Sequence, residues 1–313
     1  MSTGNAENHS PRPESRSEPA DRGEASGREK ASGRREASGQ EKASGRGGAA
    51  GRGAPPPLEN RRAVVTGGSR GIGRAVGEEL GRAGARVVLA SRTRESVEAV
   101  ASELRDEGLE AHGLPCDATD PSSVEELLQG AQDALGGIDI LVNNAGRSSS
   151  APLHRLSLEE WNDLLAVNAT STFLCTQAFL PEMVEQGWGR VVNLASVSGL
   201  RGGKYISAYA AAKHAVVGLT RSIALEVARS GVTVNAVCPG YVDTPMTDRS
   251  VARIVEKTGR SEDEARQALV EASPQGRIVE PKEVAHAVLS LCHPDARGVN
   301  GTTLVIDGGG LAG

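Results

Sequence analysis

Tyr209 and Lys213 lie four residues apart in a segment with helical periodicity, residues 207–230. That spacing puts both side chains on one face of a helix. The pKa of a free tyrosine is about 10, and a nearby ammonium group favours the phenolate and lowers this pKa. The pair is therefore a candidate proton donor and acceptor for a carbonyl/alcohol couple.

Ser196 follows a β-branched run, residues 191–195, and is expected at the carboxyl end of a strand. In parallel α/β sheets, ligands bind at this edge. The Ser196 hydroxyl could hydrogen-bond a substrate oxygen and hold it against Tyr209. Ser198 is an alternative for that role. The simpler interpretation of Ser196 is an ordinary serine at the end of a strand. His214, which follows Lys213, points about 100° around the helix and is expected to be structural.

A glycine-rich turn follows the first β-branched run: Thr66-Gly67-Gly68-Ser69-Arg70-Gly71-Ile72-Gly73. Gly67, Gly71 and Gly73 permit a tight turn and close approach of a pyrophosphate. The helix that begins there supplies free N–H groups and the positive end of its dipole. The spacing Gly-x-x-x-Gly-x-Gly differs from the common dinucleotide fingerprint, and the turn alone is a weak signal.

The end of the second predicted strand indicates which cofactor is bound. An acidic residue there would bind the ribose 2′-hydroxyl of NAD, whereas a basic one suits the 2′-phosphate of NADP. The sequence reads Ala90-Ser91-Arg92-Thr93-Arg94 and holds no acid, and Arg70 can add a second guanidinium. Arginine matches phosphate oxygens well, so we expect NADP(H) rather than NAD. The alternative is that Arg92 and Arg94 are solvated charges.

The elements that must position these residues alternate between short β-branched runs and longer helical segments. Alternating strands and helices predict a single doubly wound, Rossmann-type α/β domain with a seven-stranded parallel sheet covered on both faces. The expected strands are residues 63–66, 86–90, 111–116, 138–143, 190–195, 233–238 and 303–306, and the expected helices are residues 72–83, 94–107, 121–135, 158–185, 207–230 and 281–291.

Two segments depart from this alternation. Residues 1–57 contain almost no large apolar side chain and repeat Ala-Ser-Gly every six residues, so we expect a disordered tail before a catalytic domain at 58–313. Residues 245–275 form a polar, helix-prone insertion (251–257 and 262–271) after a strand's carboxyl end, and we expect a substrate lid there. The alternative for residues 1–57 is a weak docking arm for an acidic partner. The alternative for residues 245–275 is a solvated excursion of the chain.

Composition excludes several classes of protein. The net charge of −5 with interspersed signs argues against nucleic-acid binding. No apolar run approaches the roughly 20 residues of a membrane span, and no secretory signal is seen. The four cysteines lack metal-type spacing, and no metal is expected. A reduced, cytoplasmic location follows by elimination.

The segment 62–309 resembles the short-chain dehydrogenase/reductase family through several ordered motifs. These are the glycine turn at 66–73, Asn143-Asn144-Ala145-Gly146, Asn168 in Val167-Asn168-Ala169-Thr170, Ser196 thirteen residues before Tyr209, Tyr209-x-x-x-Lys213, and Pro239-Gly240-Tyr241-Val242-Asp243-Thr244. The residues of these motifs are similar to those of ketoacyl-thioester and polyketide ketoreductases and of hydroxyacyl dehydrogenases.

The resemblance implies a role for each matching residue. Tyr209 would be the general acid in reduction, Lys213 would bind the nicotinamide ribose and depress the tyrosine pKa, Ser196 would position the carbonyl, and Asn168 would anchor a relay water. The residues expected to bind the cofactor are Gly67, Ser69, Arg70, Gly71, Ile72, Gly73, Arg92, Asp117, Ala118, Asn144, Ala145, Gly146, Tyr209, Lys213, Pro239, Gly240, Val242 and Thr244.

The expected activity is NADP(H)-dependent hydride transfer to or from a small-molecule carbonyl or secondary alcohol. A 3-oxoacyl thioester, linked to CoA or a carrier protein, is the leading substrate. The alternatives are a dehydrogenase of a 3-hydroxy acid, sugar alcohol or steroid, and a catalytically silent NADP-binding regulator. Surplus apolar residues on the long predicted helices, together with the resemblance, imply a homotetramer or homodimer.

Overall fold

The computed structural model describes residues 55–312, so the predicted tail lies outside the described residues except for positions 55–57. Seven parallel strands form one sheet in the order β3-β2-β1-β4-β5-β6-β7. This confirms the predicted doubly wound, Rossmann-type fold. The strands are β1 (Arg62–Thr66), β2 (Arg86–Ser91), β3 (Ala111–Pro115), β4 (Ile140–Asn143), β5 (Gly189–Leu194), β6 (Val232–Pro239) and β7 (Thr303–Ile306).

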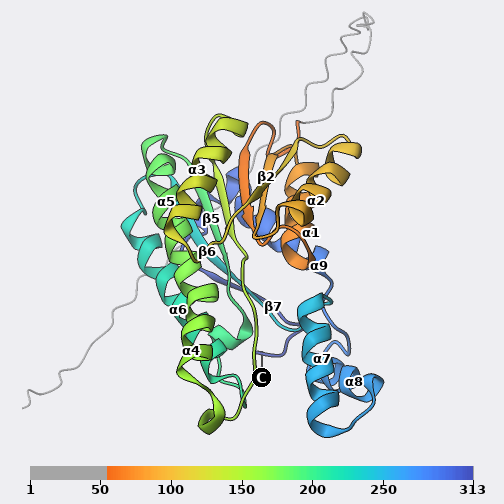
Figure 1. The fold of residues 1–313 in the computed structure, drawn as a ribbon. Coiled ribbons are helices and arrows are strands. Elements are labelled where there is room, and N and C mark those ends of the chain that lie inside the picture. Colours follow the sequence, from red (N-terminus) through yellow and green to blue (C-terminus); the bar gives the residue numbers. More distant parts are fainter. Residues whose placement is uncertain (1–54, 313) are drawn as a thin grey trace, which may run out of the picture. The chain divides into compact units, whose positions relative to one another are not determined.

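Helices cover both faces of the sheet (Figure 1). Successive residues of a strand point to opposite faces, and Val64 and Val65 of β1 belong to different apolar clusters. The cluster that contains Val65 includes α1 (Gly71–Arg82), α2 (Arg94–Asp106) and α9 (Pro281–Cys292), and the cluster that contains Val64 includes α3 (Pro121–Leu135), α5 (Ser171–Glu185) and α6 (Ser207–Glu226). Within residues 55–312, none of these helices combines the length and apolar character that crossing a bilayer requires.

The helix predicted over residues 158–185 is interrupted. The structure has α4 (Leu158–Leu165), a π-helical turn at Ala166–Thr170 and then α5. The amide of Asn168 donates to the Leu164 carbonyl at 3.0 Å, and the Thr172 hydroxyl donates to the Asn168 carbonyl at 3.2 Å. Side-chain groups that bond to backbone carbonyls in this way compete with the regular α-helical ladder. The second long helix also ends earlier than predicted, at Glu226 rather than residue 230.

The insertion predicted over residues 245–275 contains two helices, α7 (Pro245–Thr258) and α8 (Glu262–Glu271). The first begins six residues before the predicted 251–257, with Pro245 at a position where proline is favoured. Val251, Ala265 and Leu269 are buried together in an apolar cluster separate from those of the sheet. The helix pair therefore has its own small core at the end of the domain (Figure 1).

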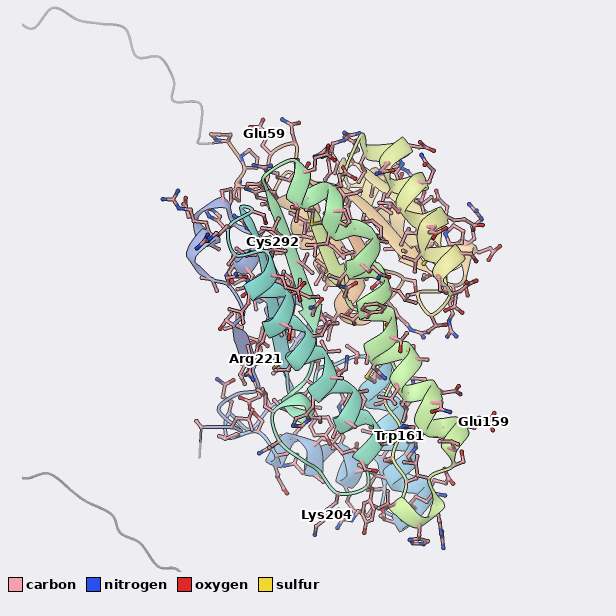
Figure 2. The ribbon with its side chains drawn as sticks, turned by 90° about the vertical axis from the view of Figure 1, so that its left-hand side faces the viewer. Glu59, Glu159, Trp161, Lys204, Arg221 and Cys292 are labelled. Atoms are coloured by element: carbon pink, nitrogen blue, oxygen red, sulfur yellow. The ribbon has the colours of Figure 1, made fainter. Side chains whose placement is uncertain are left out.

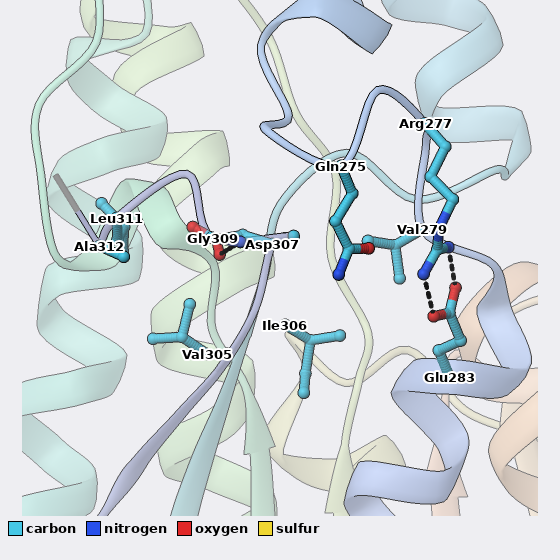
Figure 3. Close-up of a pocket in the computed structure, with 11 residues that line it drawn as sticks. Gln275, Arg277, Val279, Glu283, Val305, Ile306, Asp307, Gly309, Leu311 and Ala312 are labelled. Carbon is cyan, nitrogen blue, oxygen red and sulfur yellow. Dashed lines mark hydrogen bonds and ion pairs between the residues drawn. The ribbon is translucent and has the colours of Figure 1, made fainter.

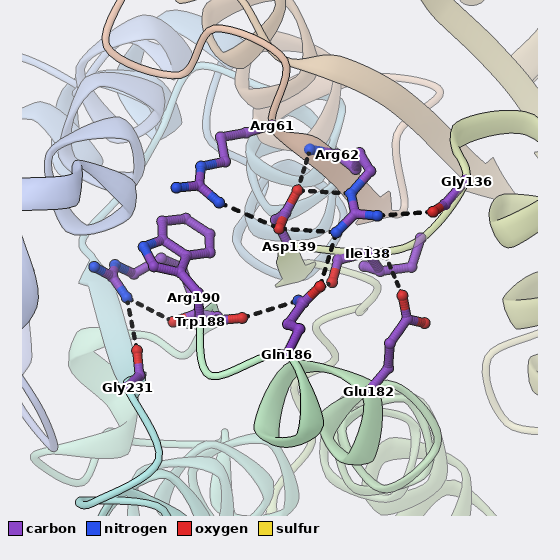
Figure 4. Close-up of polar contacts among 11 residues, drawn as sticks. Arg61, Arg62, Gly136, Ile138, Asp139, Glu182, Gln186, Trp188, Arg190 and Gly231 are labelled. Atoms are coloured by element: carbon purple, nitrogen blue, oxygen red, sulfur yellow. Dashed lines mark hydrogen bonds and ion pairs between the residues drawn. The ribbon is translucent and has the colours of Figure 1, made fainter.

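An ionic cluster joins the amino ends of the strands, opposite the edge where the predicted site lies (Figure 4). The Asp139 carboxylate accepts from Arg62 Nε at 2.8 Å and Arg62 Nη2 at 3.0 Å, and Arg61 Nη1 lies 3.4 Å away. The Trp188 ring lies under the guanidinium of Arg61 at 3.7 Å and that of Arg190 at 4.4 Å, both measured to the ring centroid. These contacts tie the starts of β1, β4 and β5 together.

Candidate active site

The turn between β1 and α1 has a backbone that requires glycine. Gly67 and Gly71 have φ values of +66° and +55°, which side chains rarely adopt. A methyl group at Gly73 would collide with the Gly67 carbonyl oxygen and with Asn144 Nδ2. The same Asn144 amide donates to the carbonyl oxygens of Thr66 at 2.9 Å and Gly67 at 3.1 Å, and so fixes the turn from the β4 side.

Thr66 joins the carboxyl ends of β1 and β4, a role that its place in the sequence did not predict. Its buried hydroxyl accepts from the backbone N–H of Asn144 at 3.0 Å and of Ala145 at 3.1 Å. The glycine turn and the Asn144-Ala145-Gly146 motif, 78 residues apart in sequence, are thereby held against each other.

A cleft of about 460 Å³ lies along this edge of the sheet. The predicted cofactor residues that line it are Gly67, Ser69, Arg70, Gly71, Ile72, Arg92, Asp117, Ala118, Asn144, Ala145, Gly146 and Thr244. Gly73, Tyr209, Lys213, Pro239, Gly240 and Val242 do not line this cleft. Gly73 lies beneath the turn, where its missing side chain allows the close approach just described.

The cleft suits a dinucleotide that carries a 2′-phosphate. At the end of β2 its wall consists of Ala90, Ser91, Arg92, Thr93 and Ser96, with no carboxylate among them. Arg94 is not in the wall. Asp117, on the neighbouring strand end, has its pKa lowered first by hydrogen bonds from Thr119 and further by the charge of Arg92. The exposed Arg92 guanidinium therefore lies beside the cleft, where a phosphate would meet it.

Ser196 and Tyr209 meet beyond the carboxyl end of β5. Ser196 is 8% exposed, and its oxygen accepts a 3.1 Å hydrogen bond from the backbone N–H of Ser198. The Ser196 side chain lies near enough to the Tyr209 phenol to lower the pKa of that phenol. Ser198 has no such effect on the phenol. The positioning role of Ser196 stays a prediction. His214 is exposed, and its Nδ1 lies 2.8 Å from the Ala210 carbonyl oxygen on its own helix.

Burial dominates the electrostatics of the tyrosine and the lysine. It raises the pKa of Tyr209, and the Ser196 contact opposes this. It lowers the pKa of Lys213 to about 8. The Lys213 ammonium lies 5.9 Å from the Tyr209 ring centroid and donates to the Leu194 carbonyl oxygen at 2.7 Å. The expected lowering of the tyrosine pKa by Lys213 is not found in this structure: burial raises the pKa of Tyr209, and only Ser196 acts to lower it.

Asn168 and Lys213 converge on Gly146. A methyl group added at Gly146 would lie 2.7 Å from Asn168 Oδ1 and 3.7 Å from Lys213 Nζ. The Asn168 amide nitrogen donates to the carbonyl oxygens of Arg147 and Leu164, while Oδ1 is buried without a protein partner among residues 55–312. A buried amide oxygen normally has a hydrogen-bond donor, so this arrangement suits an ordered water between Asn168 and Lys213.

A chain of buried polar side chains positions the two helices of the site. Asn143 Nδ2 donates to Thr176 Oγ1 at 2.9 Å and to Asn193 Oδ1 at 2.8 Å, and Asn193 Nδ2 donates to Thr220 Oγ1 at 2.9 Å. The chain runs from α5 through β4 and β5 to α6. It therefore sets the helix that carries Tyr209 and Lys213 against the strand that ends before Ser196.

A second cavity, of about 510 Å³, lies at the end of β7 and contains none of the predicted site residues (Figure 3). Val305, Ile306 and Leu311 form apolar parts of its wall, and Arg277 forms a two-point ion pair with Glu283 at its rim. A third charged residue of the wall, Asp307, accepts at Oδ1 from the Gly309 backbone N–H at 3.0 Å.

Several residues of the cleft were not found from the sequence. Arg147 directly follows the Asn144-Ala145-Gly146 motif, and Thr66 opens the glycine turn, so adjacency to a motif was the available signal. Asp163, Met246 and Arg249 reach the cleft from α4 and α7. No local spacing indicated these three, because their place depends on how the helices pack.

Comparisons with known proteins agree with this geometry. The family model described as short chain dehydrogenase matches residues 61–254. A putative ketoacyl reductase of the granaticin polyketide synthase from Streptomyces violaceoruber is 41% identical, with 79% of this chain and 92% of the relative covered. A 3-oxoacyl-acyl-carrier-protein reductase from Vibrio cholerae is 40% identical over 80% of this chain and 98% of its own length.

A further relative and a solved structure extend the match. A D-beta-hydroxybutyrate dehydrogenase from Rhizobium meliloti is 37% identical over 80% of this chain and 99% of its own. The crystal structure of an actinorhodin polyketide ketoreductase variant with NADPH is similar at 39% identity and a TM-score of 0.78, covering 80% of this chain and 96% of that one.

Proposed function

Because this chain belongs to the short-chain dehydrogenase family, we propose that it is an NADPH-dependent oxidoreductase that reduces the ketone of a 3-oxoacyl thioester. The observation that carries the proposal is the meeting of Ser196, Tyr209 and Lys213 at the carboxyl edge of the sheet, next to a cleft whose walls suit NADPH. The ketoacyl reductases that match over almost their whole length support the substrate class.

The cofactor would lie along the cleft, with its pyrophosphate at the glycine turn and α1, and its 2′-phosphate beside Arg92. When bound, NADPH supplies the hydride for the carbonyl carbon. Arg70 is exposed at the same turn and can provide a second guanidinium. These assignments account for the absence of an acidic side chain among the cleft residues at the end of β2.

The chain's own side chains provide the proton. The Ser196 hydroxyl donates a hydrogen bond to the substrate carbonyl oxygen, and the Tyr209 phenol gives its proton to that oxygen as negative charge develops. The raised pKa of Tyr209 keeps the phenol protonated and ready to act as an acid. Lys213 and the water expected at Asn168 Oδ1 return a proton toward Tyr209 after each turnover.

Steady-state NADPH consumption tests the proposal. The substrates are acetoacetyl-CoA, acetoacetate, a sugar ketone and a steroid ketone, with 3-hydroxybutyrate and NADP for the reverse direction. We expect acetoacetyl-CoA to give the highest kcat/KM. The hydroxybutyrate dehydrogenase relative supports a second candidate, oxidation of a free 3-hydroxy acid. Activity confined to that acid would replace the thioester proposal, and no turnover with any substrate would support a silent NADP-binding regulator.

Self-association through α5 and α6 is part of the proposal. The two helices lie side by side on one face of the molecule (Figure 2). Ile223 and Val227 are buried toward the sheet, whereas Phe173 and Leu225 remain 43% and 80% exposed. Exposed apolar side chains on these helices suit a second copy of the chain. Sedimentation velocity should show a dimer or tetramer. A monomer at micromolar concentration would exclude self-association.

We also propose a cytoplasmic location. All four cysteines are free and buried. Unpaired cysteines are typical of proteins in a reducing compartment. Fractionation of cells that express the full chain, with the protein detected by antibody, should recover it with the cytoplasmic fraction. Recovery with another fraction would overturn this assignment.

A further inference from the structure

Arg253 on α7 reaches across the mouth of the site to the segment that follows β4. Its Nη1 donates to Ser149 Oγ at 3.2 Å and to Ser150 Oγ at 3.3 Å, although the partners are more than 100 residues apart in sequence. Ser149 and Ser150 follow Arg147, which lines the cleft. The Arg253 guanidinium therefore lies where α7 faces the β4–α4 segment.

Arg253, Ser149 and Ser150 do not line the cleft themselves, but they adjoin the segment that leads to the catalytic helix. The backbone N–H of Ala151, the next residue after Ser150, donates to the Tyr205 carbonyl oxygen at 2.8 Å. Tyr205 lies four residues before Tyr209, in the turn that precedes α6. The serines that contact Arg253 thus belong to a segment hydrogen-bonded to the approach to the catalytic helix.

The charge of Arg253 is not neutralised by a direct ion pair. Among residues 55–312 no carboxylate lies within 4.0 Å of its guanidinium, whereas Arg266 of the same helix pair bonds to both Asp243 and Asp248. The charge of Arg253 lowers the pKa of two carboxylates, Glu160 and Glu256, to a minor extent. Each of them is already held by another cation, Glu160 by Arg147 through two contacts of 3.1 and 3.2 Å and Glu256 by Lys257 at 2.7 Å. Two serine hydroxyls are weak acceptors for a guanidinium.

A second arginine adds positive charge to the same face of α7. Arg249, one turn before Arg253 and on the same helix face, lines the cleft and also forms no ion pair within the described part of the chain. Arginine presents a planar fork of N–H groups that matches phosphate or carboxylate oxygens. With Arg249 in the cleft wall and Arg253 one turn further from it, this helix face favours a ligand that carries negative charge away from its reacting carbonyl.

We propose that Arg253 is a specificity-determining residue that binds an anionic oxygen group of the substrate, exchanging its serine hydroxyl partners for phosphate or carboxylate oxygens. The inference rests on the proposed reduction of a 3-oxoacyl substrate and deepens it. The group has two possible sources: the phosphate of a pantetheine arm, as in a CoA thioester, or the carboxylate of a free 3-oxo acid. We assign the phosphate source, because a ketoacyl thioester is the proposed substrate.

Matched substrates separate charge recognition from chemistry. Acetoacetyl-CoA carries phosphates, acetoacetyl-N-acetylcysteamine presents the same acyl group on an uncharged thiol, and acetoacetate carries only a carboxylate. Arg253→Gln should lower kcat/KM for acetoacetyl-CoA about tenfold or more, mainly through KM, as expected for loss of a charged hydrogen bond. With the uncharged thioester, the kcat/KM of Arg253→Gln should differ less than about twofold from that of the unsubstituted protein. A loss confined to acetoacetate would assign the carboxylate source instead.

Two further variants test whether Arg253 merely fastens α7 to the β4–α4 segment. The double substitution Ser149→Ala, Ser150→Ala removes both hydroxyl partners but keeps the arginine, and Arg260→Gln removes an exposed charge after the end of α7. Charge recognition predicts that both variants behave like the unsubstituted protein. Equal losses with all three substrates in Arg253→Gln, reproduced by the double serine variant, would overturn the proposal.

Binding of free coenzyme A gives a readout that does not depend on turnover. Isothermal titration should show at least about tenfold weaker coenzyme A binding to Arg253→Gln than to the unsubstituted protein or Arg260→Gln. Equal affinities would overturn the phosphate assignment even if thioesters are reduced. Coenzyme A binding that depends on Arg253, without reduction of any ketone, would contradict the proposed function and leave the anion site standing.

Discussion

The Lys213 ammonium donates a 2.7 Å hydrogen bond to the carbonyl oxygen of Leu194, which ties the helix carrying Tyr209 to the last residue of β5. This bond places a buried cation behind the strand end that leads to Ser196. Burial lowers the pKa of Lys213 to about 8 and raises that of Tyr209. Near neutral pH the phenol therefore keeps its proton, and the lysine is the group of the pair that titrates.

The pH profile of reduction should report Lys213. Its pKa of about 8 means that the ammonium form prevails below pH 8 and is lost above it. Because the proposed role needs the charged form, kcat for ketone reduction should be level at lower pH and fall toward tenfold per unit above about pH 8. Rates between pH 6 and 10 with saturating NADPH would measure this, and a level profile up to pH 10 would contradict it.

Tyr209→Phe tests the proton donor. The substitution removes one hydroxyl from a site whose ring and neighbours remain, so NADPH binding and thermal unfolding should be unchanged. Turnover should fall at least about 10²-fold, the scale of general acid catalysis. Tyr205→Phe is the matched control, because Tyr205 is 62% exposed. Retained turnover in Tyr209→Phe would remove the tyrosine from the mechanism.

The sequence was sufficient for the parts of the site that depend on local spacing. Tyr209 and Lys213 share a helix face because they are four residues apart, and Ser196 follows β5 because the β-branched run ends there. The parallel sheet follows from the same alternation of strand and helix patterns. These features need no knowledge of what lies across the fold.

The features that the sequence did not predict depend on contacts between distant segments. The interruption near Asn168 arises where its amide bonds to the carbonyls of Leu164 and Arg147. The direction of the Tyr209 pKa shift is set by burial, a property of the packed structure. The contact of Arg253 with Ser149 spans 104 residues. Hydrophobic periodicity carries no information about any of these contacts.

Arg92→Ala tests the choice of cofactor. Arg92 lines the cleft at the end of β2, whereas Arg94, two residues later, does not. The affinity for NADPH should fall about tenfold or more, as expected for loss of a charge-assisted bond to the 2′-phosphate, while NADH binding changes little. Fluorescence titration of both cofactors measures this, with Arg94→Ala as the control. Equal effects of Arg92→Ala on the two cofactors would show that Arg92 is a surface charge.

Asp139→Asn tests the ionic cluster at the amino ends of the strands. The Asp139 side chain is 6% exposed and that of Arg62 is 23% exposed, and Asp139 also accepts from the Arg62 backbone N–H at 3.0 Å. Removing the carboxylate charge weakens the hydrogen bonds that both arginines make to it, so the free energy of unfolding should fall by about 1.5–3 kcal/mol. Urea unfolding measures the change. Glu107→Gln, in an exposed pair with Arg82, should leave the free energy of unfolding nearly unchanged, because solvent screens such pairs.

Leu58 is the first buried side chain among residues 55–312. Its side chain is fully buried in the cluster beneath β1, and its backbone N–H donates to the Ala83 carbonyl at 2.9 Å, whereas residues 55–57 are exposed. A chain that starts at Leu58 should therefore keep the melting temperature and turnover of the full chain. Leu58→Ala in the full chain should cost about 2–5 kcal/mol, since it empties a buried site. A truncated chain that loses turnover but keeps its melting temperature would show that the preceding residues take part in catalysis or binding.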